Sequence, residues 1–186
     1  MDCIIIYVTR HGETDYNVQK RYTGSTDIPL NANGLYQAEE LANNLTSIDF
    51  DIIVSSPLLR AKQTAEVIHK RYDVPIVFID EFAEINVGVY EGLTREEAQA
   101  QYPNLWAKLG SRPIDDAPTG AETHRQFDFR IAVGIAKIKS EYIKNNVLLV
   151  CHGFTARTIN RQLTGLSFED MHTFSLGNCE IVKYTV

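Results

Sequence analysis

Short apolar segments rich in β-branched residues recur along the chain and alternate with longer segments of helical periodicity. The apolar runs cover residues 3–8, 52–54, 76–79, 147–150 and 181–184. The first four are almost uninterrupted by polar residues, which is typical of strands covered on both faces. Strands that alternate with helices form a largely parallel sheet. The pattern therefore predicts an α/β fold, a three-layer α/β/α sandwich whose mostly parallel central sheet carries helices on both faces.

Three of the intervening segments repeat apolar residues every three or four positions, as a helix buried on one face requires. These stripes run from Leu35 to Leu45, from Ala61 to Tyr72 and from Phe127 to Tyr142. The third lies on a long helix that we expect to end near Asn145. No repeat, low-complexity segment or long linker divides the 186 residues, so we expect one domain over residues 1–186.

Charge and composition exclude several classes of partner. The formal net charge is −6, which disfavours nucleic acid because binding it usually needs a basic face. A local cluster of arginines can still bind an anionic substrate. No apolar run has the length of a membrane span, and the first residues lack the pattern of a signal peptide. We therefore expect a soluble protein with no membrane partner; monomer and homodimer both stay open.

The cysteines indicate the compartment. Cys3, Cys151 and Cys179 are an odd number without C-x-x-C spacing, and the first two lie inside apolar runs. This pattern predicts buried thiols in a reducing environment rather than disulfides or a zinc site. The expected location is the cytoplasm.

Chemically reactive side chains follow the first apolar run, at Arg10, His11 and Gly12. Functional sites of parallel sheets collect at the carboxyl ends of the strands, where these residues are expected. Arginine binds phosphate oxygens in pairs, and backbone N–H groups at a helix start bind the same anion. A neutral histidine whose second ring nitrogen is held is a competent nucleophile. By itself the tripeptide fits a nucleophile and a buried structural histidine equally.

The next three strand ends carry further groups of the same kind. Arg60 lies in the first turns of the helix after the second strand, off its apolar stripe; alone it fits a solvated charge. Glu84 lies in a glycine-spaced acidic loop after the third strand, where a general acid could act, although alone it equally fits a solvated loop charge. His152 ends the fourth strand, where it could stabilise charge on a phosphoryl group, although alone it equally fits a core histidine. Together these residues supply what phosphate chemistry needs.

Five sequence runs resemble the histidine phosphatase superfamily, in its cofactor-independent phosphatase and phosphoglycerate-mutase-like branch. They occur in the family order over most of the chain, from Ile4 to about Gly165. The runs are R-H-G-E-T-x-x-N from Arg10, D-x-P-L-x-x-x-G from Asp27, S-S-P-x-x-R-A-x-Q-T-A from Ser55, E-x-x-x-G-x-x-E-G from Glu84 and C-H-G-x-x-x-R from Cys151.

The resemblance implies a role for each matched position. His11 would be the nucleophile that becomes phosphohistidine, and Glu84 would act as general acid and then as general base. The catalytic set would be completed by Arg10, Arg60 and His152, which would bind the phosphoryl group. No cofactor and no metal are implied, because arginines and histidines supply the positive charge. The substrate-binding residues would be Arg10, Asn17, Thr23, Gly24, Arg60, Glu84, His152, Gly153 and Phe154.

The chain departs from the family pattern where a substrate would be selected. Phe154 replaces a small residue, Thr23 precedes Gly24 where amide and aromatic types are common, and the usual G-E-S appears as G-A-E-T over residues 120–123. The resemblance also implies a lid at about residues 93–121, which carries Tyr102, Trp106 and Arg112. Trp106 fits a packing residue equally, and the role of His124 stays open.

These observations predict a phosphoric monoester hydrolase that acts on a small phosphorylated metabolite through phosphohistidine on His11. One alternative is a phosphoglycerate mutase; such enzymes tend to be longer, with more basic residues guarding the pocket than this lid carries. Another is a non-catalytic phosphate-binding regulator, against which Glu84 speaks because a binder needs no general acid. Sugar phosphates, ribazole-type nucleotides and phosphorylated amino acids all stay open as substrates.

Overall fold

The computed structural model describes residues 3–109 and 114–186. Its centre is a five-stranded sheet of order β3-β2-β4-β1-β5. Strands β1, β2, β3 and β4 run parallel to one another, and β5 pairs antiparallel with β1. The predicted mostly parallel sheet is therefore confirmed. The strands are β1 (Ile5–Arg10), β2 (Ile52–Ser55), β3 (Ile76–Phe78), β4 (Val147–Cys151) and β5 (Ile181–Thr185).

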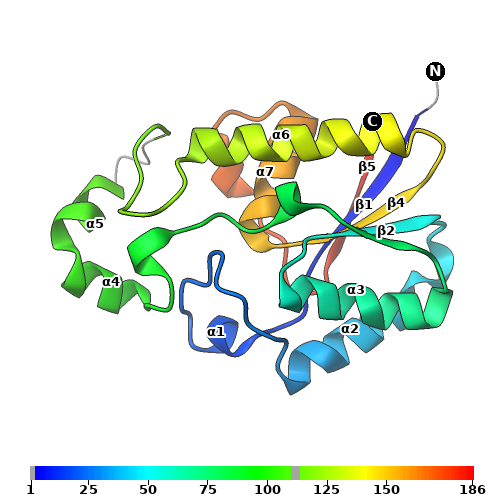
Figure 1. Cartoon of the computed structure of the whole chain (residues 1–186), viewed down its shortest axis with the longest axis horizontal. Helices are drawn as coiled ribbons and strands as arrows, with labels where there is room; N and C mark the ends of the chain where they lie inside the picture. The colour runs from blue at the N-terminus through cyan, green and yellow to red at the C-terminus, as the bar shows by residue number, and fades with distance from the viewer. Residues whose placement is uncertain (1–2, 110–113) are drawn as a thin grey trace.

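Helices cover both faces of this sheet, as Figure 1 shows, with α2 and α3 on one side and α6 and α7 on the other. The predicted three-layer sandwich is thus confirmed. The α-helices are α1 (Asp15–Val18), α2 (Ala32–Asn44), α3 (Leu59–Tyr72), α4 (Arg95–Gln101), α5 (Pro103–Leu109), α6 (His124–Glu141) and α7 (Gly153–Thr164); the 3₁₀ turns are η1 (Leu45–Ser47), η2 (Asp80–Phe82), η3 (Gly88–Tyr90) and η4 (Asp170–Thr173).

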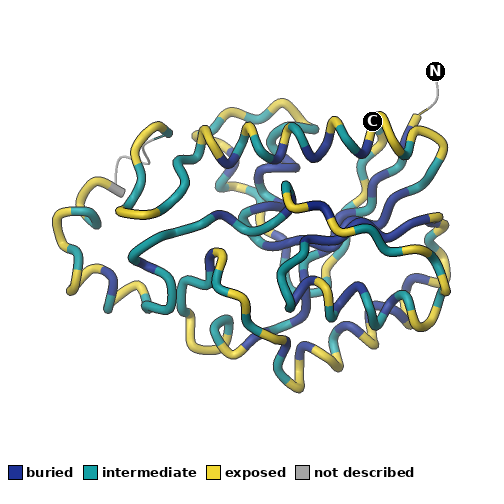
Figure 2. The backbone as a smooth tube through the Cα atoms, viewed as in Figure 1, coloured by how far each residue is buried: buried dark blue, intermediate teal, exposed yellow. Residues whose placement is uncertain are grey.

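Two apolar layers form because successive strand residues point to opposite faces of the sheet. In β4, Val147 and Leu149 pack with α6 and α7, whereas Leu148 and Val150 pack with α2 and α3. Figure 2 shows the buried backbone concentrated in the strands and in the helix faces that meet them. Both faces of β4 are buried, which explains its uninterrupted apolar sequence.

Three sequence expectations differ from the structure. The third helix ends at Glu141, not near Asn145, because Tyr142 turns its ring onto the core and its carbonyl accepts a hydrogen bond from the Asn145 N–H. Leu35 is exposed, since it lies in the first turn of α2. Cys3 is also exposed, because it precedes the paired part of β1; Cys151 is buried as predicted.

The segment with α4 and α5 lies away from the sheet (Figure 1). It is joined to the rest by aromatic rings: Tyr90 packs against Tyr22, Tyr102 and Trp106, with ring centroids 5.9–6.2 Å apart. Trp106 therefore has a packing role here. Over residues 3–109 and 114–186, the structure contains no helix of the length and apolarity needed to cross a membrane.

The loop after β3 is packed tightly beneath α6. Phe82 is fully buried there, and a Cβ at Gly134 of α6 would lie 2.9 Å from its ring. We expect Phe82→Ala to lower the free energy of unfolding by about 3–5 kcal/mol, because it removes a ring and leaves a cavity. Urea unfolding followed by circular dichroism measures this loss.

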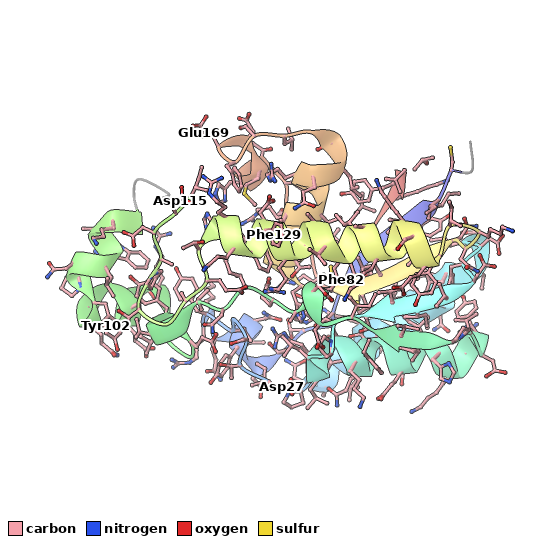
Figure 3. The ribbon with its side chains drawn as sticks, turned by 45° about the horizontal axis from the view of Figure 1, so that its top comes forward. Asp27, Phe82, Tyr102, Asp115, Phe129 and Glu169 are labelled. Atoms are coloured by element: carbon pink, nitrogen blue, oxygen red, sulfur yellow. The ribbon has the colours of Figure 1, made fainter. Side chains whose placement is uncertain are left out.

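Phe129→Ala provides the matched control, since Phe129 is a phenylalanine of α6, the helix that covers Phe82, and is 72% exposed. Both residues are labelled in Figure 3. The control should change stability by less than about 0.5 kcal/mol. Equal losses in the two variants would contradict the described packing.

Candidate active site

The parallel pairing of β1 with β4 brings two histidines together at the carboxyl ends of the strands. Arg10 lies beside Cys151 in the sheet register, so the residues that follow, His11 and His152, become neighbours. Their ring centroids are 5.1 Å apart. Helix α7 begins directly afterwards, at Gly153.

A cavity of about 500 Å³ opens at this edge of the sheet. It is lined by nine of the ten residues that the sequence analysis selected, together with further residues from the loops. The exception is His152, which is fully buried behind the cavity wall. The nine are Arg10, His11, Asn17, Thr23, Gly24, Arg60, Glu84, Gly153 and Phe154.

His11 is held in one tautomer. Its Nδ1 lies 2.6 Å from the carbonyl oxygen of Gly12, which can only accept, so Nδ1 carries the proton and Nε2 carries the lone pair. Burial lowers the pKa of His11 well below 6.5, and the nearby guanidinium groups of Arg60 and Arg10 lower it further. The imidazole is therefore neutral at pH 7, the state in which a histidine acts as a nucleophile.

Two glycines hold the turn that carries His11. A Cβ at Gly12 would lie 2.3 Å from the carbonyl oxygen of Gly34, at the start of α2. The Gly12 N–H donates to Thr64 Oγ1 on α3 at 3.1 Å. The turn after β1 is thus packed directly on two helices. A Cβ at Gly34 would lie 2.1 Å from the Glu13 carbonyl oxygen, which explains why the run D-x-P-L-x-x-x-G ends in glycine.

Arg60 is a buried cation rather than a solvated one. It is 1% exposed, and its terminal nitrogens donate to the carbonyl oxygens of Gly24 and Thr26, each at 2.8 Å. Burial lowers its pKa to about 10, so it stays charged at pH 7. The sequence alone left Arg60 open to interpretation as a surface charge; the structure places it in the cavity wall.

Arg10 supplies a second, half-buried guanidinium with an unused donor. One terminal nitrogen donates to the Leu176 carbonyl oxygen at 3.3 Å, whereas Nε is buried without a partner among the described residues. A buried donor that lacks a partner is costly, and an anion in the cavity would supply one. Gly153 lies against this group, because a Cβ there would be 3.6 Å from the guanidinium.

His152 contacts both Arg60 and His11 from its buried position. Its Nδ1 accepts from Arg60 Nε at 3.2 Å, so the proton lies on Nε2, which is 2.7 Å from Ser56 Oγ. Burial, followed by Arg60, lowers its pKa well below 6.5. Both ring nitrogens thus contact protein groups, and direct binding of a phosphoryl group by His152 stays a prediction.

The carboxylate of Glu84 lies at the N-terminus of α7. One oxygen accepts from the Phe154 N–H at 3.0 Å, and the other from the Thr155 N–H at 3.0 Å and from Thr155 Oγ1 at 3.1 Å. Helix starts favour negative charge because their N–H groups have no partner within the helix. Glu84 therefore lines the cavity close to the backbone that follows His152.

Glu91 holds the loop of Thr23 and Gly24, a role that the sequence analysis did not assign. Its carboxylate accepts from the Ser25 N–H and hydroxyl, each at 2.8 Å, and from the Thr26 hydroxyl. Gly24 has φ of +53°, and a Cβ there would lie 2.3 Å from Glu91 Oε1. The second glutamate of the E-x-x-x-G-x-x-E-G run was the available signal.

Asn17 links the turn after β1 to the last loop of the chain. Its Oδ1 accepts from the Thr14 N–H at 3.1 Å and from Asn178 Nδ2 at 3.4 Å, and Asn178 also donates to the His11 carbonyl oxygen at 2.8 Å. Asn178 belongs to none of the five sequence motifs, so the sequence alone could not predict its contacts with Asn17 and His11.

The far wall of the cavity is aromatic. Phe154 packs against the rings of His124 and His172, with centroids 5.2 Å and 6.2 Å away, and the guanidinium of Arg157 lies over its ring. Burial, followed by Arg157, lowers the pKa of His124 below its usual value. Phe154 and His124 thus face the space that the non-phosphate part of a ligand would fill.

The predicted lid contributes Asp116, Ala117, Pro118 and Ala121 to the cavity lining. Tyr102 and Trp106 pack on Tyr90 instead, and Arg112 lies outside the described residues. No group of three or more His, Cys, Asp or Glu side chains among residues 3–109 and 114–186 is arranged to hold a metal ion.

The buried histidines make stability depend on pH. The pKa of His11 is lower in the folded than in the unfolded chain, so the unfolded chain binds more protons and stability falls as pH drops below about 6.5. Between pH 6.5 and 5.5, the free energy of unfolding should fall less steeply in His11→Gln than in the wild-type protein. The difference between the two slopes should be up to about 1.4 kcal/mol per pH unit. Urea titrations at both pH values test this; parallel slopes in the two proteins would contradict a neutral buried His11.

Comparison with known proteins gives one consistent assignment. The family model of the histidine phosphatase superfamily (branch 1) matches residues 6–186. The uncharacterized phosphatase PhoE of Bacillus subtilis is 38% identical over 160 residues, 86% of this chain and 77% of its own. The probable phosphoglycerate mutase GpmB of Escherichia coli is 28% identical over 96% of this chain and 83% of its own.

Solved structures of related phosphatases have the same fold. The α-ribazole phosphatase of Shigella flexneri superposes with a TM-score of 0.89 at 28% identity, over 97% of this chain and 89% of that one. A mycobacterial glucosyl-3-phosphoglycerate phosphatase in complex with VO3 superposes with a TM-score of 0.86 at 27% identity, over 98% and 90%. The match of the family model over nearly the whole chain, the five motifs and the shared fold lead to one conclusion: this chain belongs to the histidine phosphatase superfamily.

Proposed function

We propose that this protein is a metal-independent phosphatase that hydrolyses small phosphate monoesters through phosphohistidine on His11. The observation that carries the proposal is the neutral imidazole of His11, with its Nδ1 proton fixed by Gly12, in the same cavity as the guanidinium groups of Arg10 and Arg60. A nucleophile and a receptor for the phosphoryl oxygens are thereby combined.

In the first step, His11 Nε2 attacks phosphorus and the bond from phosphorus to the ester oxygen breaks. Glu84 donates its proton to the leaving alkoxide, which departs as the alcohol. In the second step, water attacks the phosphohistidine, Glu84 takes the proton of this water, and inorganic phosphate leaves with His11 restored. Arg10 and Arg60 stabilise the charge of the transferring group, the part that metal ions have in other phosphoryl-transfer enzymes.

The substrate class follows from the cavity and from the relatives. A volume of about 500 Å³ suits a small metabolite, and the aromatic wall around Phe154 lies beyond the phosphate-binding end. Relatives named as α-ribazole phosphatase and glucosyl-3-phosphoglycerate phosphatase act on small phosphorylated compounds. Both findings support a small phosphorylated metabolite as substrate.

A phosphatase is favoured over a mutase by the residues that the lid presents. Asp116, Ala117, Pro118 and Ala121 line the cavity from the segment 93–121, and none of them carries positive charge. A mutase must retain a phosphorylated acid beside the phosphohistidine until the group returns, which favours cationic guarding residues.

The nucleophile is tested with His11→Ala. Purified wild-type protein, assayed with excess chelator, should release inorganic phosphate from 4-nitrophenyl phosphate and form an acid-labile phosphoprotein. The variant should lose the phosphoprotein and at least about 10³-fold in kcat, because no second nucleophile is available. His69→Ala on α3 is the matched control and should keep full activity. Turnover at the wild-type rate in His11→Ala would contradict the assignment of His11 as nucleophile. Interconversion of 2- and 3-phosphoglycerate by the wild-type protein without phosphate release would favour the mutase.

The acid is tested with Glu84→Gln and two esters. Loss of a proton donor matters most where the leaving alkoxide is a strong base, so kcat for an alkyl phosphate should fall by about 10²–10⁴-fold. The loss for 4-nitrophenyl phosphate should be much smaller, since nitrophenolate leaves without protonation. Steady-state kinetics on both esters measure the difference, and equal losses would remove the general-acid role.

A further inference from the structure

Arg130 of α6 binds the backbone of the loop that carries Glu84. One terminal nitrogen donates to the carbonyl oxygens of Glu81 at 2.9 Å and Ala83 at 3.0 Å. The other lies 3.5 Å from the carbonyl oxygen of Glu84 itself. A guanidinium on α6 therefore contacts the peptide groups on both sides of Glu84.

Glu122 holds this guanidinium in place and extends the contact along the loop. Arg130 Nε and a terminal nitrogen donate to its two carboxylate oxygens at 3.0 Å and 2.8 Å, a bidentate pair. The same carboxylate accepts from the Asn86 N–H at 3.0 Å. Arg130 and Glu122 thus contact the loop before and after Glu84, and the Arg130 guanidinium also lies over the buried ring of Phe127.

Thr155 of α7 holds the same loop from the other side. Its hydroxyl lies 3.4 Å from the carbonyl oxygen of Ala83 and 3.1 Å from the carboxylate of Glu84. The backbone of the loop is therefore fixed by α6, and the carboxylate is fixed by α7. Arg130 itself does not belong to the described residues that line the cavity, whereas its partner Glu122 does. Arg130 therefore reaches the cavity only through the loop and through Glu122.

We propose that Arg130 and Glu122 form a positioning pair that sets where the carboxylate of Glu84 meets the leaving group. This inference rests on the proposed function, in which Glu84 is the general acid. A lysine at position 130 would keep the charge but not the planar fork, which binds a carboxylate and several carbonyl oxygens at once. Charge alone is therefore insufficient for the role.

The test compares Arg130→Lys with wild type on an alkyl phosphate and on 4-nitrophenyl phosphate. We expect kcat for the alkyl phosphate to fall by about 100-fold, because a displacement of about 1 Å at a reacting group has that effect. The loss on 4-nitrophenyl phosphate should be much smaller. The inhibition constant for inorganic phosphate should stay unchanged, since Arg10 and Arg60 are untouched.

A double-mutant cycle separates positioning from general weakening of the fold. In the Glu84→Gln background, Arg130→Lys should cause no further loss on the alkyl phosphate, because the residue it positions has lost its proton. Lys137→Gln is the matched control: Lys137 lies on the same helix and forms an ion pair with Glu81 in the same loop, but with its side chain. This control should leave the ratio of the two ester rates unchanged.

The possible results distinguish the positioning role of Arg130 from the general-acid role of Glu84. Equal losses on both esters in Arg130→Lys, or an additive cycle, overturn the positioning role while the role of Glu84 stands. If Glu84→Gln itself fails to discriminate between the esters, the general-acid assignment falls, and the inference falls with it. Should Arg130→Lys not fold, Glu122→Gln takes its place, with the same expected pattern on the two esters. Because Glu122 itself lines the cavity, the inhibition constant for inorganic phosphate must also stay unchanged in this variant.

Discussion

The parallel pairing of β1 with β4 is the constraint on which the site depends. It sets Arg10 beside Cys151, and the next residue of each chain segment is a histidine. Because every residue of β4 is buried and β1 buries Ile6 and Val8, a shift in register would expose apolar side chains and is strongly disfavoured. The arrangement of His11 against His152, and the start of α7 directly behind them, are thereby fixed by the packing of the core.

Burial determines the chemistry of this site. A guanidinium as deeply buried as that of Arg60 is tolerated because carbonyl oxygens of the loop 24–26 and the ring of His152 satisfy its donors. The same desolvation, with two cations nearby, keeps His11 neutral. One low-dielectric environment therefore yields both the cationic groups and the neutral imidazole that the proposed mechanism uses.

The sheet, its direction and the strand-end placement of the reactive groups could be predicted because apolar runs and glycine-flanked motifs are local signals. Nine of the ten selected residues line one cavity for that reason. The position of His152 behind the wall could not be predicted, since it depends on its contacts with Arg60 and Ser56 from other elements. Asn178 and Arg130 were missed because they reach the site by long-range contacts and belong to no motif.

The unpartnered Nε of Arg10 has a consequence for the whole reaction cycle. Its missing partner can be any phosphoryl oxygen, whether on an ester, on the phosphohistidine or on free phosphate. The cavity therefore gains a hydrogen bond when product is present and must lose it again before the next turnover. If the proposed function holds, the donor that binds a phosphate ester would bind inorganic phosphate as well, so the product would compete with the substrate for the pocket.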